Sequence, residues 1–167
     1  MRHVLPILTA LLAAIAASAV LAQAQIGFGG DAFDSAQPVE VTSDSLSIDQ
    51  ASGEAVFSGN VIVVQGDLRL ATERLQVRYG PGTDGGAGAV EDLQASGGVL
   101  VTRGGDAAEG DAARYRVSDG ALAMTGDVLI TQGGTAIAGD RLVVDLETGI
   151  GTVEGRVRTV IDPESAE

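Results

Sequence analysis

The residues of this chain that could take part in chemistry are nearly all carboxylates. The sequence contains a single histidine, His3, and no cysteine or lysine. A Ser-His pair, a reactive thiolate, a Schiff base and a histidine-ligated metal each require one of these residue types. His3 lies in a segment that we expect to be removed during export, which would leave the mature protein without any of them. The sequence therefore argues against an enzyme of these classes.

Carboxylates remain as candidates, because paired acids can hydrolyse glycosidic bonds. The densest clusters are Glu91–Asp92 and the group Asp106, Glu109 and Asp111. Acids in such Gly-rich surroundings also accept backbone hydrogen bonds in turns or solvate the edges of strands. We favour this structural interpretation and predict no catalytic residues and no cofactor.

A calcium site is the second possibility that the acids raise. Gly-Asp pairs recur along the chain, but they lack the nonapeptide spacing of calcium-binding β-rolls. We therefore predict no metal. The pairs are Gly66-Asp67, Gly110-Asp111, Gly126-Asp127 and Gly139-Asp140.

The basic residues are all arginine. Loss of Arg2 with the export segment would change the net charge from −13 to −14, and so acidic a chain lacks the basic face that nucleic-acid binding requires. The arginines are interpreted either as solvated strand positions or, for a few at a groove mouth, as ligands for phosphate groups. Spacing does not distinguish these roles. Most lie at outward strand positions, namely Arg74, Arg78, Arg114, Arg116 and Arg141.

The elements that must position these residues are repeated. Four turn glycines are separated by 38, 29 and 29 residues, and four acids that open the following strand are separated by 29, 38 and 29. Both series give a 29-residue period with one nine-residue insertion, which matches Gly80–Gly88 in length and place. A fixed period of this kind predicts a fold built from stacked units. The glycines are Gly59, Gly97, Gly126 and Gly155, and the acids are Asp44, Glu73, Asp111 and Asp140.

Within each repeat, apolar and polar residues alternate with the period of a half-buried strand. No segment has a helical apolar period, so the mature protein is predicted to be all-β, with about three strands and tight Gly-Asp, Gly-Gly or Ser-Gly turns in each repeat. Stacked repeats would form two facing antiparallel sheets or one rolled sheet. The predicted inward residues are Phe57, Val61, Val63, Leu75, Val77, Val99, Val101, Tyr115, Met124, Val128, Ile130, Leu142 and Val144.

The predicted interior contains few aromatic rings, although rings usually help to fill the gap of roughly 10 Å between packed sheets. Two interpretations follow. In the first, small aliphatic side chains fill a narrow core completely; in the second, the interior is partly open to an apolar ligand such as an acyl chain. The sequence does not decide between them.

The N-terminal residues predict that the protein is exported. Residues 1–22 have the form of a signal peptide, with cleavage after Ala22 or Ala24; an uncleaved membrane anchor is the alternative. We expect a flexible N-terminal segment over residues 23–38, with Phe28 and Phe33 touching the domain edge. The ordered domain is predicted to cover residues 39–161, and a tail to cover residues 162–167.

Several repeated phrases resemble the LptA/OstA-like family of periplasmic lipopolysaccharide transport proteins. They are SDSLSID, GNVIVVQG, ATERLQV, GDVLITQG and GDRLVVDLETG, and the similarity extends over Val39–Val157. The resemblance implies a β-jellyroll of stacked antiparallel strands whose open, V-shaped interior holds lipid acyl chains. It also implies edge-to-edge assembly into a bridge between the two membranes.

From this resemblance we expect a periplasmic carrier that binds lipopolysaccharide non-covalently between its strands. The expected partners are an inner-membrane LptC-like and an outer-membrane LptD-like jellyroll, and further copies of this chain could join head to tail. The docking edges would be Val39–Ile48 and Val153–Ile161, because an unpaired strand edge can pair with another chain. The alternatives are a structural β-repeat protein with a closed core, such as an adhesin or matrix component, and an LptC-like member with an uncleaved anchor.

Overall fold

The computed structural model describes residues 23–30, 33–82 and 87–162 of the chain. The predicted signal peptide, residues 1–22, lies outside this part. The described residues form one antiparallel sheet of 11 strands, in the order β1-β10-β9-β8-β7-β6-β5-β4-β2, with β11 on β9 and β3 on β4. A single 3-10 turn, η1 (Val117–Asp119), interrupts the described strands. The strands are β1 (Gln23–Gly27), β2 (Glu40–Thr42), β3 (Ser45–Asp49), β4 (Glu54–Gln65), β5 (Leu68–Pro81), β6 (Ala87–Arg103), β7 (Asp106–Arg116), β8 (Ala121–Gln132), β9 (Thr135–Asp145), β10 (Ile150–Glu154) and β11 (Arg158–Ile161).

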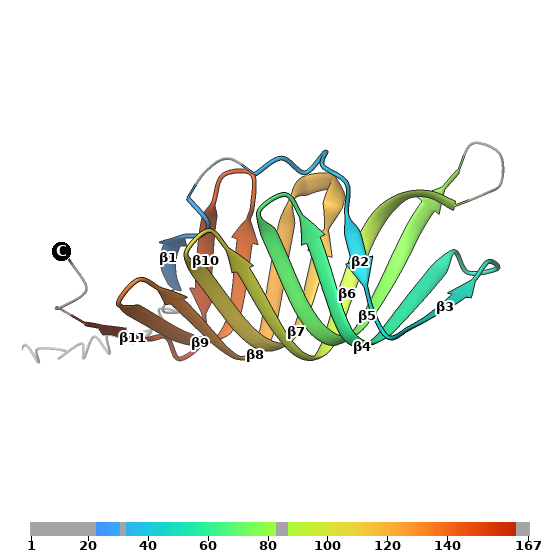
Figure 1. The fold of residues 1–167 in the computed structure, drawn as a ribbon. Coiled ribbons are helices and arrows are strands. Elements are labelled where there is room, and N and C mark those ends of the chain that lie inside the picture. The colour runs from blue at the N-terminus through green and yellow to red at the C-terminus, as the bar shows by residue number, and fades with distance from the viewer. Residues whose placement is uncertain (1–22, 31–32, 83–86, 163–167) are drawn as a thin grey trace, which may run out of the picture.

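Strands β4 to β9 follow one another as a meander, and each strand bends near its middle (Figure 1). Where β4 pairs with β5 the register shifts between Ser58 and Val61, and a similar shift occurs at every later pair of the meander. The bends divide the sheet into two facing half-sheets. We call the half that ends in the Gly66-Asp67 turn the front half-sheet, with β2 and β11. The other half, with β1, β3 and β10, is the rear half-sheet.

The prediction of about three strands in each repeat is wrong, since each repeat contributes two long, bent strands. Three of the repeat glycines, Gly59, Gly97 and Gly126, lie within a strand, and Gly155 lies between β10 and β11. All four carry a positive φ, for example +79° at Gly59, and the following residue shares this conformation. Such a pair produces a bulge, after which pairing continues with the same partner strand. The all-β, repeat-built jellyroll architecture itself is confirmed.

The repeated glycines and the repeated acids lie against each other at the bends of the strands, which we call the strand corners. A Cβ atom added to Gly59 would lie 2.6 Å from Asp44 Oδ2, because the acid of one strand packs over the glycine of its neighbour. The backbone N–H of Asp44 donates to the Gly59 carbonyl over 2.9 Å. The same arrangement recurs between Asp140 and Gly155, where the backbone bond is 3.1 Å. The acids therefore repeat with the glycines because each side of the corner requires the other.

The sheet includes residues well before the predicted start of the domain at Val39. Strand β1 pairs with β10, and Phe28 and Phe33 are buried in the core instead of touching the domain edge. The described ends of the Gly80–Gly88 insertion continue β5 and β6, and Pro81 pairs with Ala87. These residues lengthen one end of the rear half-sheet, and residues 83–86 lie outside the described part of the chain.

Candidate functional site

The candidate site is the space between the two half-sheets. All of the predicted inward residues face this space: Phe57 is partly buried and packs against the core, and every other member of the set is buried. The structure adds further small apolar residues that the predicted set omitted. These are Ala55, Leu68, Leu70, Leu93, Ala95, Ala108, Ala113, Leu122, Ile137, Leu146 and Val153. The result is a continuous, aliphatic interior in contact with all of the long strands.

The bends of the strands form the closed lower edge of this interior, and the two rims of the half-sheets face each other on the opposite side, which we call the mouth (Figure 1). Polar residues are buried at the front rim. Gln65 and Arg103, the last residues of β4 and β6, are each only 1% exposed. Burial of polar groups is costly unless they are hydrogen-bonded. The hydrogen-bond partners of Gln65 and Arg103 therefore show which contacts hold the two rims together.

Arg103 spans the mouth from the front rim to the rear rim. Its guanidinium donates to the Leu146 carbonyl at 3.2 Å and is paired with Asp67 at 3.2 Å. It also lies 5.1 Å from the centre of the Phe33 ring, within the range of a cation–π contact. The sequence-based interpretation of the arginines as outward or rim-exposed residues does not hold for Arg103.

A second link across the mouth joins Tyr115 of the rear half-sheet to Gln65. The Tyr115 hydroxyl donates to Gln65 Oε1 at 2.8 Å. Burial, followed by the nearby charges of Glu147 and Asp119, raises the pKa of Tyr115 to about 12. The hydroxyl is therefore protonated at neutral pH and is available as a donor. Tyr115 and Arg103 together tie the two half-sheets to each other at the mouth.

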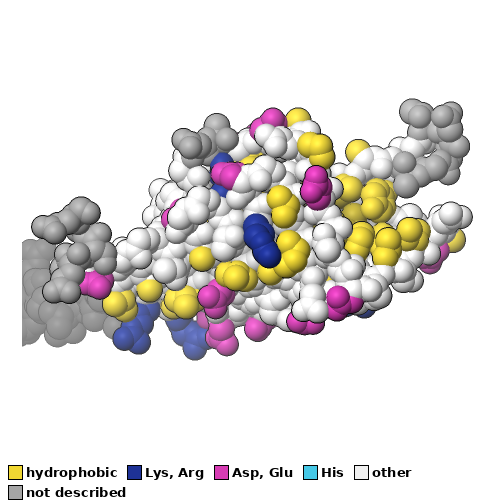
Figure 2. Space-filling view, in the orientation of Figure 1, with side chains coloured by type: hydrophobic (Ala, Val, Ile, Leu, Met, Phe, Trp, Pro, Cys, Tyr) yellow, Lys and Arg dark blue, Asp and Glu magenta, His cyan; other side chains and the backbone are white. Residues whose placement is uncertain are grey.

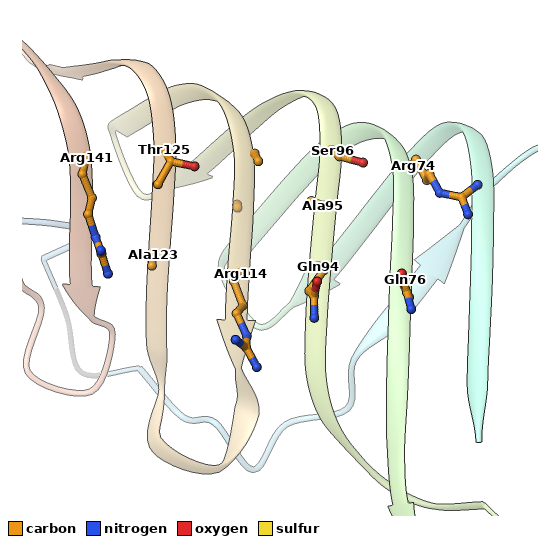
Figure 3. A pocket seen from close by; sticks show the side chains of 11 residues that line it. Arg74, Gln76, Gln94, Ala95, Ser96, Arg114, Ala123, Thr125 and Arg141 are labelled. Atoms are coloured by element: carbon orange, nitrogen blue, oxygen red, sulfur yellow. The ribbon is translucent and has the colours of Figure 1, made fainter. Parts of the chain in front are cut away.

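The outer face of the rear half-sheet carries the five arginines that were predicted to point outward, and all of them are exposed. Arg74, Arg114 and Arg141 lie along a shallow groove of about 370 Å³ (Figure 3), which Ala112 and Ala123 also line. Asp92 lies buried beside them and pairs with Arg114 at 2.7 Å and Arg78 at 3.4 Å. Burial by itself would raise the pKa of Asp92, but hydrogen bonds from Arg114 and Gln94 and the charges of both arginines outweigh it and lower the pKa.

The acids that seemed candidates for catalysis have structural contacts. Asp106 accepts hydrogen bonds from the Gly29 N–H at 2.7 Å and from Gln132 at 2.9 Å. Asp111 packs over Gly126 at a strand corner, and Asp92 is held by its two arginines. Among the described residues, no group of three acids or histidines is placed to hold a metal ion. These contacts give Asp92, Asp106 and Asp111 structural roles.

The outside of the molecule exposes apolar side chains in two places. Figure 2 shows hydrophobic side chains on the outer face of the front half-sheet, where Val64, Leu100 and Leu129 are exposed. Others lie at the two ends of the roll, with Ile48 in β3 64% exposed and Ile161 in β11 69% exposed. No helix in the described part of the chain is long and apolar enough to cross a membrane.

Comparison with known proteins agrees with this architecture. A model of the family described as LptA/(LptD N-terminal domain) LPS transport protein matches residues 40–150. An uncharacterized protein of Rhizobium meliloti (strain 1021) is 30% identical over 161 residues, which cover 92% of this chain and 87% of that protein. The crystal structure of LptH, the LptA homologous periplasmic component of the lipopolysaccharide transport device of Pseudomonas aeruginosa, superposes with a TM-score of 0.66. It is 21% identical, and the match covers 76% of this chain and 96% of LptH. The chain belongs to the LptA/(LptD N-terminal domain) family of LPS transport proteins.

Proposed function

We propose that this protein is a periplasmic carrier that binds lipopolysaccharide by its acyl chains between the front and rear half-sheets. The observation that carries the proposal is the continuous aliphatic interior, which reaches through every strand of the meander. Membership of an LPS transport family supports the same role. Lipopolysaccharide would be held without covalent chemistry and without a cofactor.

The free energy for binding would come from burial of the acyl chains. Each buried CH₂ group contributes about 0.8 kcal/mol, so ten methylenes would contribute about 8 kcal/mol. Side chains such as Val128, Ile130 and Leu142 offer no polar atom for specificity. Binding would therefore be selective for apolar chains of suitable length and tolerant of their detailed structure. Movement of the lipid along the interior would need energy from a partner.

The ends of the roll suit the proposed assembly into a bridge. Within the described part of the chain, β3 pairs only with β4 at one end and β11 pairs only with β9 at the other, so each has one edge without a partner strand there. Exposed apolar residues lie on both, including Leu46 and Val160. Such edges can pair with a strand of another chain. The proposed partners are an LptC-like jellyroll at the inner membrane, an LptD-like jellyroll at the outer membrane and further copies of this chain.

One observation favours a second candidate, a structural β-repeat protein with a closed core. The interior side chains are packed tightly enough that Val101, Ile130 and Leu142 are 0% exposed. A carrier must separate the half-sheets to admit lipid, whereas a structural protein would remain closed. The two candidates therefore differ in whether the interior opens.

Site-specific photocrosslinking of the mature protein to purified lipopolysaccharide tests the proposal. One photoreactive residue replaces Val128, which faces the interior, and the control replaces Arg116, which lies on the outer face of the rear half-sheet. The carrier predicts lipid adducts at position 128 and none at position 116. If neither position reacts while the protein is folded and lipid is abundant, the closed structural protein becomes the better interpretation.

A further inference from the structure

The mouth of the interior is covered by part of the N-terminal segment. We call its described residues, Phe28–Gly30 and Phe33–Pro38, the strap. The strap connects β1, at one end of the rear half-sheet, with β2, at the other end of the front half-sheet (Figure 1). It must therefore cross from one rim to the other. At its start, the Phe28 N–H donates to the Gly149 carbonyl of the rear rim at 2.7 Å.

The strap is held by side chains that occupy the equivalent position in successive repeats. Gln65, Arg103 and Gln132 are the last residues of β4, β6 and β8, immediately before the front turns. Gln65 Nε2 donates to the Ser35 carbonyl at 2.9 Å and the Gln37 carbonyl at 2.8 Å. Three successive repeats thus present a polar side chain to the same N-terminal segment.

The other two residues bind close to the junction of β1 with the strap. Arg103 donates to the Phe28 carbonyl at 3.5 Å. Gln132 donates to the carbonyl of Gly27, the last residue of β1, and to Asp106, which in turn accepts from the Gly29 N–H at 2.7 Å. These groups satisfy the backbone of a segment that has no strand partner over the mouth.

Two aromatic side chains of the strap enter the mouth. Phe28 is 0% exposed, and Phe33 is 7% exposed. The Phe33 ring packs edge-on against Tyr115 of the rear half-sheet, with 6.5 Å between the ring centres, and its face lies under Arg103 of the front rim. Phe33 is thus in contact with both half-sheets at the place where an acyl chain would pass between them.

We propose that the strap is a built-in competitor of the lipid: its two phenylalanines occupy acyl-chain space at the mouth, and lipid enters only when the strap is displaced. This inference rests on the proposed function as a lipid carrier. The strap keeps the aliphatic interior away from water when no lipid is bound. Its contacts set the fraction of molecules that can bind, and the apparent dissociation constant is the intrinsic constant divided by that fraction. Weakening the strap must therefore tighten lipid binding, even though it removes a core contact.

The first test compares two truncations in the full mature chain. Phe33→Ala removes one of the two phenyl rings of the strap. As the matched control, Leu122→Ala removes a buried side chain from the interior face of the rear half-sheet. Both variants are expected to lose stability towards urea. Phe33→Ala should bind purified lipopolysaccharide at least about tenfold more tightly than the parent, whereas Leu122→Ala should bind it no more tightly. Equal or weaker binding by Phe33→Ala would contradict competition by the strap.

The second test follows the strap directly, and the absence of cysteine from the chain makes single labelling straightforward. A spin label is placed at Gln37→Cys in the strap and, as a control, at Ser118→Cys in the turn that precedes β8; both positions are exposed. Addition of lipopolysaccharide should mobilise the label at position 37 and leave the label at position 118 unchanged. Bound lipid with an immobile label at position 37 would overturn the strap inference and leave the carrier intact. No lipid binding by any variant would overturn both.

Discussion

The contact between acid and glycine at the strand corners can be measured through Gly126. This residue has a φ of +83°, and a Cβ atom added to it would overlap the side chain of Asp111. An alanine in left-handed backbone costs about 1–2 kcal/mol. The overlap adds about 1–3 kcal/mol, the usual cost of overpacking. We therefore expect Gly126→Ala to lower the free energy of unfolding by about 2–5 kcal/mol.

Two other glycines serve as controls that separate these effects. Gly133 has a φ of +54° with no atom within 4 Å of an added Cβ, and Gly105 has open space and no positive φ. Gly133→Ala should cost about 1–2 kcal/mol, and Gly105→Ala should remain within about 0.5 kcal/mol of the parent. Urea titrations give the three free energies if the slope m is unchanged. If Gly126→Ala and Gly133→Ala are equally destabilised, the acid does not pack on the glycine as described.

Three further changes test the mouth and the outer face. Tyr115→Phe removes the bond to the buried Gln65, and we expect a loss of about 1–3 kcal/mol in unfolding free energy. Arg103→Met should lower the free energy of unfolding by about 1–3 kcal/mol, because it removes the side-chain donor to the buried Phe28 and Leu146 carbonyls, whereas the exposed Arg74→Met should change stability by less than about 0.5 kcal/mol; equal effects would contradict the burial of Arg103. The lowered pKa of Asp92 means that its contribution is fully present above the unfolded pKa of 3.8 and is lost as the pH falls through the lower folded value. In the Asp92→Asn variant, the free energy of unfolding from urea titrations should therefore fall less steeply as the pH is lowered. If this pH dependence is the same as in the parent, Asp92 does not contribute to stability through its charge.

The alternation of apolar and polar residues along the strands was sufficient to predict which side chains face the interior. If the same alternation had been followed for two more residues along β4 and β6, it would also have placed the polar residues of the mouth on that face. Val99 and Val101 were placed inward, and Arg103 is the next residue on the same face. The same step leads from Val63 to Gln65. A charged residue at the end of an apolar face was interpreted as solvated, because burial of a charge is normally too costly. The partners that offset this cost are Asp67, the Leu146 carbonyl and the N-terminal segment, which lie far from Arg103 in sequence and could not be seen in the local pattern.

The number of strands was misjudged because glycine at positive φ serves both in hairpin turns and in bulges. Only the pairing of residues far apart in sequence distinguishes these uses, as when Ser58 and Val61 both pair with β5. The N-terminal segment was misjudged for a related reason. Phe28 and Phe33 do not alternate with polar residues, so their burial depends on tertiary contacts, which for Phe33 include Tyr115 and Arg103.

The central claim, that acyl chains lie between the half-sheets, is tested most directly by a scan of four consecutive positions on β8. A photoreactive residue is placed in turn at Val128, Leu129, Ile130 and Thr131, and adducts with purified lipopolysaccharide are quantified. Leu129 is the critical control because it is apolar and exposed on the outer face. We expect adducts at positions 128 and 130 and none at 129 and 131. Adducts at position 129 that equal or exceed those at 128 would place the lipid on the outer face and would contradict binding between the half-sheets.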